Sequence, residues 1–330
     1  MAKLRLTLAC GDYDLTRALL DGKVEPDGIE LITLTMPSPE RHWRMIRNKE
    51  FDVCEFSMCQ YMVSKSNNEP LMAIPVFPHR RFRHSYIFIN AKAGIKNPKD
   101  LEGKRVGLRS SQNTAGLWIR GMLQHYYNVS LKKIRWITQN EEPVAVSSKA
   151  GLKTERVTPG DDIDRMLVKG ELAAAIYPDV LPSFERGDKA VKLLFDDPIK
   201  EERRYFADTG LFPIMHTVVI KQTVIEKFPW VAKSLQAAFQ KAKEICYHRM
   251  DDPRKVSLAW FMHYWEEQKK ILGGDPWVYG LAENKENLEN MVLYAYEQGL
   301  IPRKFKLEEI FLQSAAEKTP KYLVDLDKLR

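Results

Sequence analysis

The hydrophobic and polar positions of the first 90 residues alternate between strand-like and helix-like patterns. Three apolar runs have the length of buried strands: 4–9, 29–34 and 51–56. Two segments between them have helical spacing, 15–20 and 39–48, and the second is entered through Ser38 as its expected N-cap. Further apolar runs of strand length follow at 71–76 and 85–90. Strands that alternate with helices predict a largely parallel sheet with helices on both faces.

A second alternation of strands and helices begins after residue 90. It opens with a short helical turn at 97–101 and a strand that enters Ser110–Thr114, and a helix follows with Trp118, Met122 and Tyr126 on one face. Three more strands are predicted, at 134–138, 172–177 and 191–195, the last returning toward the first unit. After a strand at 213–220, long helices are predicted at 230–248, 255–270 and 286–298.

This order predicts a two-lobed α/β fold in which the chain crosses between the lobes twice. We expect 1–90 and 211–330 to form the first lobe with the C-terminal helices, and 91–210 to form the second. Two crossings make a hinge, with a ligand held in the central cleft. Ligands of open α/β sheets bind beyond the carboxyl ends of the strands, which draws attention to 11–13, 55–57, 110–114 and 177–179.

Charge and composition narrow the class of partner. The chain has 51 Lys and Arg against 44 Asp and Glu, a net charge of +7, but the basic residues are dispersed and no nucleic-acid motif accompanies them. A small anionic ligand steered toward a positive cleft explains the excess.

No apolar stretch approaches the ~18 residues of a membrane span, and the N-terminus lacks the pattern of an export signal. Four cysteines without CxxC spacing fit a reducing compartment, so we expect a cytoplasmic protein.

Several stretches resemble one enzyme family. They are Asp52–Ser57, Phe77–Ser85, Leu117–Gly121 and Gly210–His216, with the more widely shared entry Asn97–Gly107. From about residue 4 to 320 the chain resembles the 4,5-dihydroxyphthalate decarboxylase family, which is built on the type II periplasmic-binding-protein fold. The resemblance implies a carboxy-lyase of phthalate catabolism and aromatic compound degradation. Its substrate would be an aromatic dicarboxylate with adjacent hydroxyls, and its product would be of the protocatechuate type.

Decarboxylation of such a ring without an organic cofactor requires an acid near the ring carbon and a base at the phenol, with cations on the second carboxylate. His84 and His216 come from the two expected crossings and could supply titratable groups in one cleft. Glu55 ends an apolar strand, where a carboxylate is costly unless paired or used. It could orient a histidine, accept a phenol proton, or form a structural ion pair with the Arg81 and Arg83 group.

The substrate-binding candidates are mostly basic residues and strand ends. If 82–89 is extended, Arg81 and Arg83 share one face and suit a carboxylate through their planar forks. The other interpretation is a solvated basic edge. Ser110, Ser111 and Thr114 lie at an expected helix start, where free N–H groups bind anions or are simply capped. The list is completed by Arg109, as a second carboxylate contact, and by two weaker candidates, Ser57 and Asp12.

Other interpretations stay open at this level. A divalent metal held by His79, His84, His216 and Glu55 fits the residue types, but the spacing is not diagnostic. The remaining histidines, including His42, are expected to be structural. The alternative function is a solute-binding protein that captures a small aromatic carboxylate for transport or sensing. The sequence does not fix the ring substituents, and it leaves a homo-oligomer open.

Overall fold

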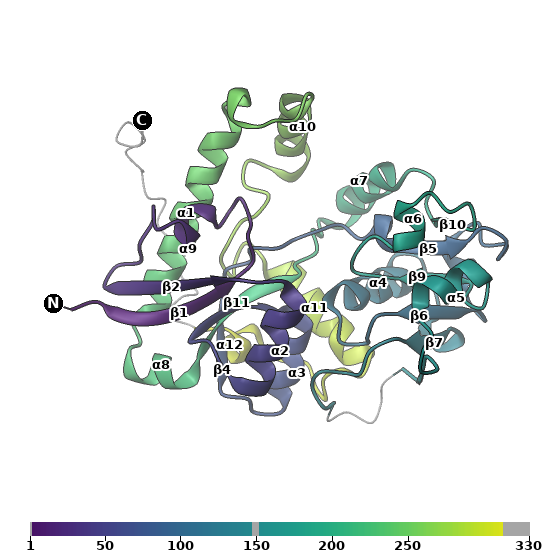
Figure 1. Cartoon of the computed structure of the whole chain (residues 1–330), viewed down its shortest axis with the longest axis horizontal. Helices are drawn as coiled ribbons and strands as arrows, with labels where there is room; N and C mark the ends of the chain where they lie inside the picture. The colour runs from purple at the N-terminus through teal and green to yellow at the C-terminus, as the bar shows by residue number, and fades with distance from the viewer. Residues whose placement is uncertain (1, 147–151, 313–330) are drawn as a thin grey trace.

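A computed structural model describes residues 2–146 and 152–312. The last residues of the expected third segment, 313–330, therefore lie outside the described part. The chain forms two lobes side by side, each built around its own sheet, with the N-terminal strands in one lobe and the middle of the chain in the other (Figure 1). The two-lobed α/β prediction is confirmed.

The first lobe contains a five-stranded sheet in the order β2-β1-β3-β11-β4. Its strands are β1 Leu4–Cys10, β2 Ile29–Thr35, β3 Val53–Ser57, β4 Leu71–Ile74 and β11 His216–Lys221. β1 is parallel to β2 and β3, whereas β11 runs antiparallel to both β3 and β4. The prediction of a largely parallel sheet is thus wrong for its far half, because β11 returns from the second lobe and enters the sheet from the opposite end.

Helices cover this sheet and extend beyond it. They are α1 Arg17–Leu20, α2 Ser38–Asn48, α3 Met58–Ser66, α8 Gln222–Lys227, α9 Val231–Met250, α10 Phe261–Leu272, α11 Lys285–Glu297 and α12 Leu307–Ile310. Ser38 is the first residue of α2 and Pro37 its N-cap, so the predicted capping role of Ser38 is wrong. α10 starts at Phe261 rather than near 255, because Pro253–Lys255 forms a separate 3-10 turn. In the described ranges no helix combines the length and apolarity needed to cross a membrane.

The second lobe contains a six-stranded sheet in the order β10-β5-β9-β6-β7-β8. The strands are β5 Ile87–Asn90, β6 Arg105–Leu108, β7 Arg135–Thr138, β8 Thr154–Arg156, β9 Ala174–Ile176 and β10 Val191–Leu193. Its helices are α4 Thr114–His125, α5 Ile163–Lys169, α6 Pro182–Glu185 and α7 Pro198–Thr209, with 3-10 turns η1 His84–Tyr86, η2 Pro98–Leu101 and η3 Leu131–Lys133.

Two strands of this sheet differ from the sequence prediction. β5 belongs to the second lobe, so the chain enters that lobe before residue 87 rather than at 90. β10 pairs with β5 and does not return to the first lobe. Both strands are short and apolar, and such a pattern says nothing of which sheet accepts the strand.

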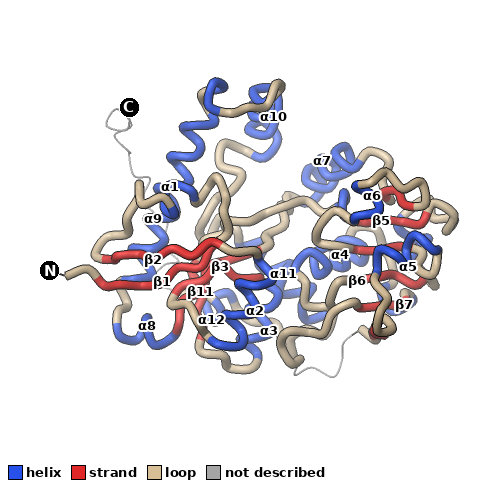
Figure 2. Tube along the Cα trace, in the orientation of Figure 1, coloured by secondary structure: helices blue, strands red, loops and turns tan. Residues whose placement is uncertain are grey.

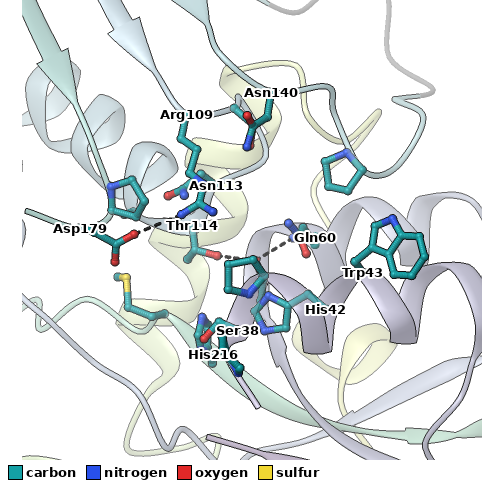
Figure 3. Close-up of a pocket in the computed structure, with 18 of the residues that line it drawn as sticks. Ser38, His42, Trp43, Gln60, Arg109, Asn113, Thr114, Asn140, Asp179 and His216 are labelled. Carbon is teal, nitrogen blue, oxygen red and sulfur yellow. Dashed lines mark hydrogen bonds and ion pairs between the residues drawn. The ribbon is translucent and has the colours of Figure 1, made fainter. Parts of the chain in front are cut away.

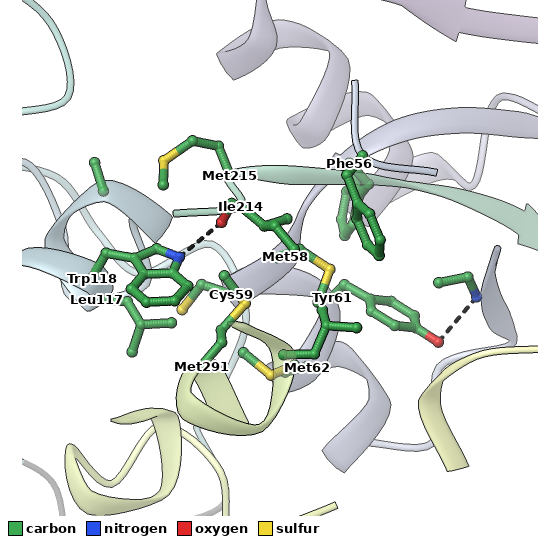
Figure 4. Packing of buried hydrophobic residues seen from close by; sticks show 14 of the residues in the cluster. Phe56, Met58, Cys59, Tyr61, Met62, Leu117, Trp118, Ile214, Met215 and Met291 are labelled. Atoms are coloured by element: carbon green, nitrogen blue, oxygen red, sulfur yellow. Dashed lines mark hydrogen bonds between the residues drawn. The ribbon is translucent and has the colours of Figure 1, made fainter. Parts of the chain in front are cut away.

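The two crossings lie against each other. The Met215 amide donates to the His79 carbonyl at 2.9 Å, and the Arg81 amide donates to the Pro213 carbonyl at 3.1 Å. The indole of Trp118 in α4 donates to the Ile214 carbonyl at 2.8 Å (Figure 4). Figure 2 shows this part of the chain as loops that run between the two sets of strands. The crossings are therefore fixed to one another and to the first helix of the second lobe.

The hydrophobic core continues through this junction. Trp118 and Leu117 of α4 pack beside Cys59 and Met62 of α3 and Met291 of α11 (Figure 4). α11 approaches α4 so closely at Gly121 that an added Cβ would overlap the ring of Tyr294. Helices α3, α4 and α11 therefore form one continuous hydrophobic core that joins the two lobes. This core holds the lobes in a fixed position relative to each other.

Candidate active site

A cavity of about 520 Å³ lies between the lobes. Helices α2 and α3 and the crossings line it from the first lobe, and the β6–α4 connection lines it from the second (Figure 3). Pockets of roughly 300–1,000 Å³ bind most small ligands, so one substituted aromatic ring fits. The cavity lies at the carboxyl ends of β3 and β6, where the sequence predicted it.

Glu55 is the buried anion beneath this cavity. Its carboxylate accepts hydrogen bonds from the Gly11 amide at 2.7 Å, the Tyr13 hydroxyl at 2.7 Å and His216 Nδ1. Arg41 Nη2 lies 2.7 Å from the same carboxylate, and both side chains of this ion pair are fully buried. The carboxylate is thus paired and fully hydrogen-bonded, which is what allows it to persist inside the protein. The ion-pair partner of Glu55 is thus Arg41 and not Arg81 or Arg83, so that prediction is wrong.

The pairing of strands brings His216 to Glu55. β11 lies antiparallel to β3 with His216 opposite Ser57, so His216 is the diagonal neighbour of Glu55 on one face of the sheet. Because Nδ1 is directed at the carboxylate, it carries the ring proton, and Nε2 is left for the cavity that His216 lines. Glu55 therefore contacts a histidine, as one of its predicted roles requires.

The charges of the pair are set by burial and by each other. Burial alone would raise the pKa of Glu55, but Arg41 and His216 hold this pKa well below its usual range. Burial lowers the pKa of His216, and the Glu55 carboxylate opposes that effect. At neutral pH the resting pair is therefore an ionised Glu55 beside a mainly neutral His216.

Two further histidines flank His216. The ring centroids of His42 and His216 are 4.9 Å apart, and those of His79 and His216 are 4.8 Å apart, both edge to face. Burial lowers the pKa of His42 and of His79 well below the ordinary value, and the neighbouring imidazoles add to this. His42 was expected to be structural. Its position one residue after Arg41, in the helix that follows β2, places it beside His216.

Two arginines supply positive charge to the cavity. Arg83 is only 4% exposed, and its Nη1 donates to the Pro178 carbonyl at 2.9 Å. Burial, and then the charge of Arg81, lower the pKa of Arg83 to about 10, so it remains a cation. Among the described residues no carboxylate lies within ion-pair distance of it. Arg109 faces the cavity from the second lobe and pairs with Asp179 at 3.1 Å.

His84 and Arg81 do not line the cavity. Residues 84–86 form a 3-10 turn, so the assumed extended strand from residue 82 is wrong. The guanidinium groups of Arg81 and Arg83 do lie over the same Tyr86 ring, but only Arg83 lines the cavity. Arg81 donates to the Tyr86 hydroxyl at 2.6 Å, and the ring of His84 packs against aromatic side chains of the second lobe. The structure therefore does not bring His84 and His216 together.

The polar residues at the strand ends have mixed positions. Ser57 and Thr114 line the cavity and hydrogen-bond to each other at 2.8 Å, which joins the two lobes. Ser110 also lines the cavity, but the Ser111 amide is taken by the Glu142 carboxylate at 2.6 Å. Ser111 does not line the cavity, and its amide is not available to a ligand there.

Asp12 lies away from the cavity, paired with Arg17 on the surface. Of the four residues that could have held a metal, Glu55, His79 and His216 lie together, whereas His84 packs among aromatic side chains of the second lobe. Within the residues that the structure describes, no group of three or more His, Cys, Asp and Glu side chains is arranged to hold a metal ion.

Comparison with known proteins agrees with the two-lobed fold. Residues 14–155 match the family model described as NMT1/THI5 like. The periplasmic aliphatic sulphonate binding protein SsuA from Escherichia coli superposes with a TM-score of 0.55 at 14% identity, covering 96% of this chain and 99% of its own, which shows a shared fold.

Two curated relatives are much closer in sequence. A 4,5-dihydroxyphthalate decarboxylase of Pseudomonas putida is 34% identical over 205 residues, 60% of this chain and 80% of the relative. A 4,5-dihydroxyphthalate decarboxylase of Comamonas testosteroni is 33% identical over 326 residues, 96% of this chain and 99% of the relative. This likeness along nearly the whole of both chains shows that the chain belongs to the 4,5-dihydroxyphthalate decarboxylase family.

Proposed function

We propose that this protein removes one carboxylate from a hydroxylated phthalate, 4,5-dihydroxyphthalate or a close analogue, and releases a product of the protocatechuate type. The observation that carries the proposal is the buried Glu55–His216 pair, which directs one imidazole nitrogen into a cavity that also contains Arg83. The family relationship supports the same reaction.

Arg83 and Arg109 are suited to hold the carboxylate that remains on the ring. Arg83 is buried and has no carboxylate partner among the described residues, so an anionic ligand supplies the missing counter-charge. Charge-assisted hydrogen bonds from a guanidinium to a carboxylate are about twice as strong as neutral ones. They also fix the plane of the carboxylate and thereby the ring orientation.

His216 is the group placed to protonate the ring carbon. The negative charges of the substrate favour the imidazolium, and the ionised Glu55 stabilises it through Nδ1. The proton moves from Nε2 to the carbon that bears the carboxylate. The carbon–carbon bond then breaks, its electron pair restores the aromatic ring, and carbon dioxide leaves. His216 regains a proton from solvent, so one proton is consumed in each turnover.

A solute-binding protein would need the same cationic residues but would gain nothing from a histidine held by a buried carboxylate. Such a dyad is a recurring arrangement for proton transfer, because the carboxylate fixes the tautomer and stabilises the charged ring. The geometry at His216 and the family relationship therefore favour the decarboxylase over the binding protein.

The test is incubation of the purified protein with 4,5-dihydroxyphthalate in deuterated buffer. We expect one carbon dioxide for each substrate consumed, and one deuterium on the product ring at the carbon that the carboxylate left. Phthalate without hydroxyls serves as the control and should not react. Binding without carbon dioxide release would favour the solute-binding alternative, and an unlabelled product would contradict proton delivery by an exchangeable group.

A further inference from the structure

Three side chains that line the cavity have a buried polar atom without a hydrogen-bond partner among the described residues: His42, Gln60 and His79. His79 belongs to the first crossing and its ring is stacked on Tyr13, whereas His42 of α2 and Gln60 of α3 belong to the helices that line the cavity. His42 Nε2 and Gln60 Oε1 are buried, and neither has a hydrogen-bond partner among the described residues. Figure 3 shows the two side chains on the same side of the cavity, away from Arg109 and Asp179.

These unpaired atoms stand out against the rest of the wall. Ser57 and Thr114 satisfy each other, and Asn113 caps α4 by accepting from the Gly116 amide at 3.1 Å. A buried polar group without a hydrogen-bond partner is unfavourable, because it has lost its bonds to water and gained none in the protein. The cost is tolerated where a ligand completes the hydrogen bonds, so the wall at His42 and Gln60 is incomplete without one.

The chemistry of the two side chains specifies what that ligand offers. Burial, the neighbouring His216 and Arg41 lower the pKa of His42 well below its ordinary value, so its ring is neutral. In the tautomer with the proton on Nδ1, Nε2 is an acceptor. The Gln60 amide oxygen is also an acceptor. Two neutral acceptors suit hydroxyl donors, whereas the carboxylates of the ligand are better served by the arginines at the other side of the cavity.

We propose that His42 and Gln60 bind the ring hydroxyls of the substrate and set the preference of the site for a ring with adjacent hydroxyls. This inference rests on the proposed function for the identity of the ring. It divides the cavity into an arginine side that holds the carboxylate and an acceptor side that binds the hydroxyls, with His216 beside His42.

The expected consequence is discrimination against rings that lack the hydroxyls. Such a ring would fill the cavity and still leave His42 and Gln60 unpaired, and sites built to hydrogen-bond a hydroxyl reject such analogues strongly. Each lost hydrogen bond is therefore expected to change a dissociation constant by up to about tenfold.

The test compares two ligands that do not react, 3,4-dihydroxybenzoate and benzoate, by titration calorimetry. We expect the intact protein to prefer the dihydroxy ligand, and His42→Phe and Gln60→Met each to reduce the ratio of the two dissociation constants about tenfold. The affinity for benzoate should stay the same in both variants. His263→Phe and Gln268→Met, on α10 outside the cavity, are matched controls that should leave the ratio unchanged.

Equal weakening of both ligands would show a structural role and overturn the inference, as would an unchanged ratio in both variants or no preference in the intact protein. Circular dichroism identifies a variant that fails to fold, and the other variant then decides. Because neither ligand is turned over, a reduced ratio without any carbon dioxide release from 4,5-dihydroxyphthalate would support the hydroxyl site and contradict the decarboxylase.

Discussion

His216 and His84 come from the two crossings, are both buried and both have a lowered pKa, yet their surroundings differ in kind. His216 has a carboxylate on one ring nitrogen and a cavity at the other. Neither nitrogen of His84 has a hydrogen-bond partner among the described residues, and the Glu202 carboxylate lies 4.0 Å away. Burial alone thus does not prepare a histidine for catalysis, which also needs an orienting partner and access to the substrate.

The largest expected difference between the two regions is in turnover. His216→Asn should lower kcat by about 10²–10⁴, the usual contribution of a general acid or base. An asparagine at this position can still contact Glu55, but it cannot deliver a proton to the substrate ring. His263→Asn, an exposed histidine on α10, is the control and should keep full activity. Steady-state kinetics on the decarboxylation of 4,5-dihydroxyphthalate measures both. A kcat that stays within about tenfold of the parent would remove His216 from the proton path.

The second difference is in stability, since only the His216 region contains a buried ion pair. Arg41→Met should lower the free energy of unfolding by about 3–5 kcal/mol, because it leaves Glu55 ionised and unpaired inside the protein. Urea denaturation measures the change. The double variant Arg41→Met/Glu55→Gln should recover part of the loss, because no charge is then left unpaired. Additive losses would mean that Arg41 acts through packing rather than through charge.

The two histidines also illustrate which parts of the fold and the site could be predicted from the sequence. Hydrophobic spacing indicated most elements and both crossings, because apolar runs of strand length are local signals. Glu55 and His216 could be found because a charged or titratable residue at the end of an apolar run is costly and therefore informative. The assignment of β5 to the second sheet could not be predicted, because the local sequence of a strand does not determine which strands pair with it.

The errors at the site have one physical source. The pattern of residues 82–89 fits an extended strand, but 84–86 turn into a 3-10 helix, which sends His84 into the aromatic cluster. Conversely, His42 lies in α2, whose sequence is that of an ordinary amphipathic surface helix. Only the packing of the start of α2 against β3, through Arg41 and Glu55, shows that His42 belongs to the site. Such contacts arise from long-range packing, so local pattern does not predict them.

Arg83 and Arg81 give the next, smaller contrast, because only Arg83 lines the cavity. Arg83→Lys should raise the dissociation constant for 3,4-dihydroxybenzoate by roughly 10–100-fold, since a lysine cannot reproduce a planar two-pronged contact with a carboxylate. Arg81→Lys is the matched variant two residues away and should change it by less than about threefold, as for a solvated charge. Equal effects of the two substitutions would indicate that both arginines contact the ligand.

The smallest effect is expected from His84→Phe, which replaces a ring among Tyr127, Phe195 and Tyr205 by an apolar ring of similar shape. At neutral pH the free energy of unfolding should change by less than about 1 kcal/mol, because removing a buried polar group without a hydrogen bond offsets the loss of fit.

Acid should separate the His84→Phe variant from its parent. Burial, and then the charge of Arg204, lower the pKa of His84 to about 3, whereas an unfolded histidine titrates near 6.5. Above about pH 6.5 His84 is neutral in both the folded and the unfolded parent, so it does not lower the free energy of unfolding there. As the pH falls toward 3, the unfolded chain binds a proton at His84 that the folded protein does not, and the free energy of unfolding decreases. Glu202 is the carboxylate that faces the His84 ring. At about pH 5 the loss is roughly 2 kcal/mol in the parent and absent in the variant, so thermal or urea denaturation should show His84→Phe to be the more stable protein there. If the stability difference between the two proteins is the same at about pH 7 and pH 5, then His84 titrates alike in the folded and unfolded chains, and Glu202 offsets the burial of the ring.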